Sequence, residues 1–159
     1  MWASIVAVLG TLAGTVLGVL SQQHLDRRAR AERHRDELAD KVRQLLKAIV
    51  LYRELHWLLV ADIRDGRAET REDRAARYRA RSEVTDARDA LALVTTDRDL
   101  IERAEAAAWA AIDLSDIELG PVTEGGFTPD VETALTAARD RTRATHNALV
   151  RAARAYRRR

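Results

Sequence analysis

The chain has 159 residues, of which 47% are hydrophobic and 33% are charged, and its formal net charge is +2. This length gives room for one compact domain with an appendage, which argues against a multidomain enzyme. The absence of cysteine excludes disulfides, thiolate metal sites and a thiol nucleophile, while the abundance of Ala, Leu, Arg, Glu and Asp predicts long helices and almost no strand.

The positive charge is concentrated in two short stretches. Residues 24–35 carry five arginines against two acids, and residues 154–159 carry four arginines and no acid. Together these stretches contribute +7, so the rest of the chain contributes −5 and is acidic. A nucleic-acid-binding domain usually presents a basic face along its length, and we therefore expect no nucleic acid among the partners.

Residues 2–20 form an uncharged, apolar segment. As a helix, its 19 residues would extend about 28 Å, close to the ~30 Å hydrocarbon core of a bilayer. The basic stretch that follows predicts, by the positive-inside rule, an anchor over residues 1–21 in the cell (inner) membrane, with the N-terminus outside and the bulk cytoplasmic. The alternative is a secretory signal peptide, which needs a basic region that Met1-Trp2 lacks.

Three glycines recur every four residues in this segment, at Gly10, Gly14 and Gly18. That spacing puts them on one helix face, where the missing side chains let a second helix approach closely. The pattern predicts a homo-oligomer formed through the membrane helix. The alternative is that small residues are simply frequent in membrane helices.

Residues 22–37 are predicted to form a basic helical stalk, with Arg27, Arg28, Arg30, Arg33 and Arg35. The next helix shows an apolar stripe whose members are four and three residues apart, as in the packing seam of a bundle. That seam comprises Leu38, Val42, Leu45, Ile49, Tyr52, Leu59 and Ile63. It is interrupted by His56, which we interpret as a hydrogen-bonded core residue or a polar residue that sets the register. Gly66 is predicted to cap the C-terminus of this helix.

Three further helices follow. The second is expected over residues 68–94, and its buried face should carry the residues at the same four-three spacing, Ala80, Val84, Ala87, Leu91 and Val94. The third begins at Thr95-Thr96-Asp97 with a threonine N-cap, ends at Gly120-Pro121 and has its apolar residues at Leu100, Ala104, Ala107, Ala111 and Leu114. Residues 120–127 are expected to be the only long loop, and Thr128-Pro129-Asp130 starts the fourth helix.

The predicted fold class is therefore all-α, an N-terminal transmembrane helix followed by an antiparallel up-down-up-down bundle over residues 38–159. The fourth helix would return to the membrane end, bringing Arg154, Arg157, Arg158 and Arg159 beside the stalk. Polybasic segments gain on the order of 1 kcal/mol per residue from anionic lipid headgroups, which makes the bilayer an expected partner. The alternative is a tail that only improves solubility.

Residues for catalysis or for cofactor binding do not stand out. The histidines His24, His34, His56 and His146 are scattered and lack ExxH or HExxH spacing, and neither phosphate-binding glycine motif is present. We therefore expect neither a metal site, nor a cofactor, nor enzymatic activity.

The apolar anchor, the RRxRxER stalk, the leucine-rich helix and the helix boundary at residues 91–97 resemble those of small single-pass membrane proteins common in actinobacteria. The resemblance implies a membrane-anchored bundle and supplies no site. The function expected is that of a structural or interaction protein with an unknown protein partner. The alternative is a membrane-perturbing or pore-forming effector, although its pore would have only Ser4, Thr11 and Thr15 as polar lining.

Overall fold

A computed structural model describes the backbone of residues 2–123 and 126–158, and the side chains of residues 28–123 and 126–158. Its helices are α1 (Trp2–Arg64), α2 (Arg71–Val94), α3 (Arg98–Ile112), a short 3-10 helix η1 (Asp113–Asp116) and α4 (Pro129–Arg157). The described residues contain no strand, only an isolated bridge between Thr123 and Gly126. The all-α prediction is confirmed.

The chain divides into two units, Met1–Glu37 and Leu38–Arg159. The first unit contains the N-terminal part of α1, and the predicted membrane span with Gly10, Gly14 and Gly18 lies outside the residues whose side chains are described. Among the residues that are described, none of the helices combines the length and apolarity needed to cross a membrane.

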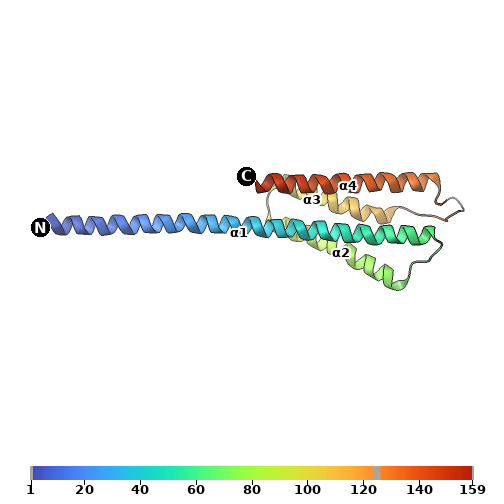
Figure 1. The fold of residues 1–159 in the computed structure, drawn as a ribbon, viewed down its shortest axis with the longest axis horizontal. Helices are drawn as coiled ribbons and strands as arrows, with labels where there is room; N and C mark the ends of the chain where they lie inside the picture. Colours follow the sequence, from blue (N-terminus) through green and yellow to red (C-terminus); the bar gives the residue numbers. More distant parts are fainter. Residues whose placement is uncertain (1, 124–125, 159) are drawn as a thin grey trace. The chain divides into compact units, whose positions relative to one another are not determined.

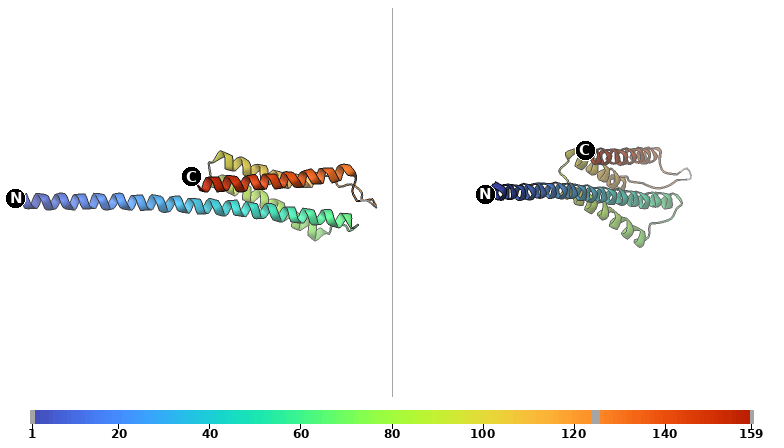
Figure 2. Two further views of the ribbon diagram at one scale, coloured as in Figure 1. Left: turned by 45° about the horizontal axis from the view of Figure 1, so that its top comes forward. Right: turned by 60° about the vertical axis from the view of Figure 1, so that its left-hand side comes forward.

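In the second unit, the C-terminal part of α1 packs with α2, α3 and α4 in a bundle in which each of these helices runs opposite to the one before it (Figures 1 and 2). Its main core draws on all four helices. Of the residues predicted from the four-three spacing, those buried in it are Ala80, Val84, Leu91, Leu100, Ala104, Ala107 and Ala111, whereas Ala87 and Val94 are half-buried against it. The most deeply buried members, at 0–1% exposure, are Leu45, Ile49, Tyr52, Val84, Leu91, Leu100, Ala108, Ala111 and Leu149. The buried face of α3 is mostly alanine, which allows neighbouring helices to approach closely.

A second, smaller core lies between the end of α1 and the start of α4. Its buried residues are Val60, Phe127 and Leu135. The connection from η1 to α4 contributes apolar side chains to it, among them Ile117 and Leu119. The loop therefore begins at residue 117 and not at Gly120 as predicted. Extended backbone here directs the apolar side chains into the second core, whereas a continued helix would turn some of these side chains toward solvent.

The helix ends are stabilised by local hydrogen bonds. Asp97 caps α3 by accepting a hydrogen bond of 3.0 Å from the Leu100 backbone N–H. The predicted threonine N-cap is therefore wrong, because the N-cap residue is Asp97. Thr95 instead accepts a bond of 3.2 Å from the Asp97 N–H and so positions the capping residue. Gly66 has a φ of +73°, as its predicted role as the C-cap of α1 requires.

Candidate functional site

The described side chains offer no ready centre for chemistry. Among residues 28–123 and 126–158, no three His, Asp or Glu side chains lie close enough together to hold a metal ion. His34 is exposed and His146 is half-buried, whereas His56 is 2% exposed in the core; the side chain of His24 lies outside the described residues. The features that remain are the surfaces of the bundle and the polar groups between its helices.

The residues predicted to pack α1 into the bundle divide into two groups. Five are buried, with exposures of 0–6%: Leu38, Val42, Leu45, Ile49 and Tyr52. Leu59 and Ile63 are only half-buried, and Val60, at 1% exposure, takes the buried position in this last turn. The stripe shifts because the second core, supplied by the loop and α4, approaches α1 from another side, a long-range effect that periodicity along one helix does not contain.

An ion pair shows the register between α1 and α4, because Arg64 lies 2.6 Å from Glu132. Leu38 precedes Arg64 by 26 residues and Arg158 follows Glu132 by 26, so in antiparallel helices they lie at about the same level. The exposed Arg154, Arg157 and Arg158 therefore sit at the end of the bundle where Leu38 begins it. In the first unit Arg28, Arg30, Arg33 and Arg35 are exposed, and the side chains of Arg27 and Arg159 lie outside the described residues.

The same register brings together a group of cations that no local pattern singled out. Arg53 lies 11 residues before Arg64 and Arg143 lies 11 residues after Glu132, which places the two arginines opposite each other. One turn along, the Arg139 guanidinium lies 5.8 Å from the centre of the Trp57 ring. We call Arg53, Arg139, Arg143 and the neighbouring His146 the seam cluster.

Electrostatics within the seam cluster are unfavourable. Burial lowers the pKa of Arg53, and the positive charges of Arg143 and Arg139 lower it further. Burial, followed by the charge of Arg53, also lowers the pKa of His146. The Arg53 Nε and the His146 Nδ1 are both buried without a hydrogen-bond partner in the described part of the chain.

No acid neutralises this cluster among the described residues. The ion pairs found there use other arginines, such as Arg64 with Glu132 and Arg141 with Asp113. The seam cluster was missed because Arg53 and Arg139 are 86 residues apart, and only the antiparallel pairing of α1 with α4 joins them. The one signal in the sequence was the pair of arginines four residues apart in α4.

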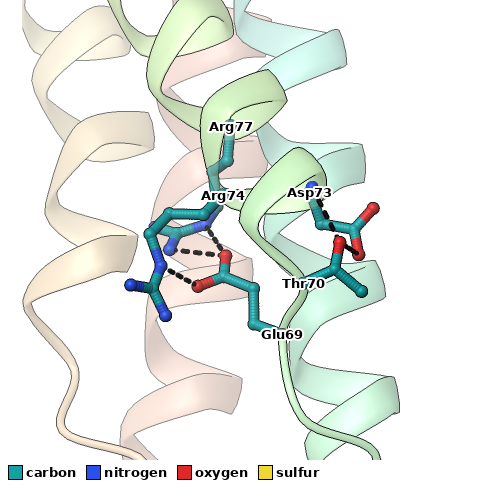
Figure 3. Close-up of polar contacts among 5 residues, drawn as sticks. All are labelled: Glu69, Thr70, Asp73, Arg74 and Arg77. Atoms are coloured by element: carbon teal, nitrogen blue, oxygen red, sulfur yellow. Dashed lines mark hydrogen bonds and ion pairs between the residues drawn. The ribbon is translucent and has the colours of Figure 1, made fainter.

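A second polar group lies where α1 meets α2. Glu69, just before α2, accepts hydrogen bonds from Arg74 at 2.9 Å and from Arg77 at 2.8 and 3.0 Å (Figure 3). Burial raises the pKa of Glu69, but these bonds outweigh it and the net shift is downward. Thr70 then caps α2 by accepting a bond of 3.1 Å from the Asp73 N–H.

His56 is buried close to this group. Burial, and secondarily the charge of Arg77, lowers the pKa of His56 to about 4. Both ring nitrogens of His56 and the hydroxyl of Tyr52 lack a hydrogen-bond partner within the described residues, so the expected hydrogen-bonded histidine is not found. The His56 ring makes an edge contact with Trp57, at 5.9 Å between centroids.

An open groove of about 400 Å³ follows the junction of α1 and α2. Its floor is apolar, formed by Ala48, Leu51, Ala87 and Ala90, and its rim carries Gln44, Lys47, Glu83 and Asp86. Farther along α1, Leu58 is 55% exposed. The groove can accept apolar side chains.

Comparison with known protein families matches residues 39–157 to the family described as KilB plasmid transfer protein. The match covers 119 of the 159 residues, which is nearly all of the second unit. No curated protein and no solved structure matches the chain. From a family match of this extent, the chain belongs to the KilB plasmid transfer protein family.

Proposed function

We propose that this chain is a membrane-anchored structural or interaction component of plasmid transfer. The link to plasmid transfer comes from the family. In this proposal the segment at residues 2–20 spans the cell membrane with the N-terminus outside, and the bundle, without enzymatic activity, binds another protein at the cytoplasmic face. We include in this proposal the resemblance of the chain to small single-pass membrane proteins of actinobacteria.

The observation that carries the proposal is the position of the C-terminal arginines. Arg154, Arg157 and Arg158 are exposed at the end of the bundle that begins with Leu38, and Leu38 follows Arg35 by three residues in the chain. Both basic stretches are thus connected to one end of the second unit, the end next in sequence to the apolar segment. This is the end where positive charge can meet anionic headgroups.

The size of this attraction decides what it can do. At about 1 kcal/mol per basic residue near an anionic surface, three arginines contribute roughly 3 kcal/mol, or about a hundredfold change in occupancy. The attraction falls off within about 8 Å at physiological ionic strength. The arginines would therefore hold an anchored bundle close to the surface, while the apolar segment supplies the anchor.

Cell fractionation tests this topology. The full chain with a C-terminal tag should stay with membranes after a carbonate wash, and its tag should resist protease until spheroplasts are lysed. Leu12→Arg places a charge at the centre of the segment, costing about 2.5–3.5 kcal/mol of insertion, and should shift the chain toward the soluble fraction. A wild-type chain in the soluble fraction, or a tag cut in intact spheroplasts, would overturn the proposed topology. Loss of plasmid transfer in a Leu12→Arg strain would support the proposed role.

Self-association through the glycine face can be tested by disulfide cross-linking in membranes. The chain has no cysteine, so Ser21→Cys introduces a single reporter on the face of Gly10, Gly14 and Gly18. Adding Gly14→Leu should reduce the cross-linked dimer several-fold, because its side chain keeps a second helix away. Val16→Leu, on the opposite side of the helix, is the matched control and should cross-link like the parent. Equal dimer yields from both variants would rule out the glycine face as the interface.

A further inference from the structure

The seam cluster concentrates positive charge at one point of the bundle. Arg53 of α1 is half-buried, whereas Arg139 and Arg143 of α4 are exposed. The face of Trp57 supports the Arg139 guanidinium at 5.8 Å. The described residues give none of these three arginines an acidic partner, although other arginines of the bundle are paired at 2.6–3.3 Å.

Such an arrangement costs folding stability. Like charges repel, and a buried guanidinium N–H without an acceptor loses its hydration without replacement. The Arg53 Nε and the His146 Nδ1 are both in this position among the described residues. An anion seated between Arg53, Arg139 and Arg143 would offset the repulsion between the three guanidinium groups and accept hydrogen bonds from their accessible N–H groups.

We propose that the seam cluster binds the phosphate groups of a small molecule, such as pyrophosphate or the polyphosphate of a nucleotide. The planar guanidinium presents paired N–H donors that match phosphate oxygens in forked hydrogen bonds. Three guanidiniums around one point suit a compact, multiply charged oxyanion.

The position of the cluster argues against a lipid headgroup as the ligand. Arg53 lies 15 residues from Leu38, about 22 Å along the helix from the bundle end that carries the C-terminal arginines. A headgroup at that end would be more than two Debye lengths away.

The surroundings of the cluster also argue against a long polyanion. Along this face of α4, Arg143 is followed by His146 and Val150 before the next arginine, Arg154, about 16 Å on. On α1 the neighbouring position is Val50, which is 48% exposed and apolar. The phosphates of a nucleic acid backbone would meet no cation beside the cluster on this face, whereas a small phosphate compound needs only the cluster itself.

Thermal unfolding of the full chain in mild detergent, at constant ionic strength, tests the proposal. Replacing chloride with pyrophosphate should raise the Tm of the wild-type chain, and calorimetry should detect binding of pyrophosphate and ATP but not of adenosine. Arg143→Gln should raise the Tm in chloride, because one repelling charge is gone, yet abolish the further rise with pyrophosphate. This pair of opposite effects separates a ligand site from a structural role.

Arg151→Gln is the matched control, since it removes an exposed arginine from another side of α4 and should respond to pyrophosphate like the wild type. Arg53→Lys keeps the charge but loses the fork, and should weaken pyrophosphate binding by tenfold or more. The proposal is overturned if Arg143→Gln and Arg53→Lys bind pyrophosphate as the wild type does. It is also overturned if the cluster variants leave pyrophosphate binding intact and lose only binding of duplex DNA or of vesicles containing phosphatidylglycerol.

Discussion

Acidification from pH 7 to pH 4 should destabilise the wild-type chain by about 3 kcal/mol more than a His56→Leu variant. The pKa of His56 is lowered to about 4 in the folded chain, by burial and then by the charge of Arg77, whereas an unfolded histidine titrates near 6.5. Between these values the unfolded state binds more protons than the folded state. Stability from this group is therefore complete above about pH 6.5 and is lost as the pH falls toward 4.

The measurement is urea unfolding of the full chain in mild detergent at several pH values, followed by circular dichroism. Arg77, which donates hydrogen bonds to Glu69, is present in both variants, and the two chains share every other titrating group. At pH 7 the leucine variant should be at least as stable as the wild type, because it removes two buried nitrogens that lack partners in the described structure. His34→Gln, at an exposed position, is the control and should follow the wild type. Parallel pH profiles for wild type and His56→Leu would show that His56 is hydrated or paired.

Leu45→Ala should cost about 2–5 kcal/mol of unfolding free energy. Leu45 is 0% exposed in the main core, where residues of all four helices meet, so truncation loses buried apolar area and leaves a cavity. The alanine-rich face of α3 brings the backbones close together, which limits how far the helices can collapse into the space. The cost should therefore fall in the upper half of that range.

Leu93→Ala is the matched control for this truncation. Leu93 is 87% exposed on α2, so the same chemical change should alter stability by no more than about 0.5 kcal/mol. Both values come from urea unfolding at pH 7. A loss below 1 kcal/mol for Leu45→Ala would mean that the core around α1 is looser than its burial indicates.

Helix positions and most core residues followed from local patterns. The four-three spacing of Val84, Leu91, Leu100 and Ala107 predicted which side of α2 and α3 is buried, because a helix repeats its faces every 3.6 residues wherever it packs. Glycine at position 66 likewise predicted the end of α1, since a φ of +73° strains most other residues.

The helix ends and the second core were harder to predict. Thr95, Thr96 and Asp97 are three consecutive residues that could each cap α3. Asp97 is the N-cap, because Thr95 is buried at 7% exposure and accepts a hydrogen bond from the Asp97 N–H. Val60 was passed over in favour of Leu59 because the loop around Phe127, which covers Val60, is 67 residues away in the chain.

For the candidate sites the same distinction holds. The uncharged segment, its glycines and the two basic stretches are properties of neighbouring residues, so the amino-acid sequence alone determines them, and their proposed roles rest on them. The seam cluster depends on which helix lies against α1 and in which register, and that follows from close packing of side chains from all four helices. No local pattern around Arg53 encodes its meeting with Arg143, because the energy that joins them comes from the core beneath and is opposed by their own charges.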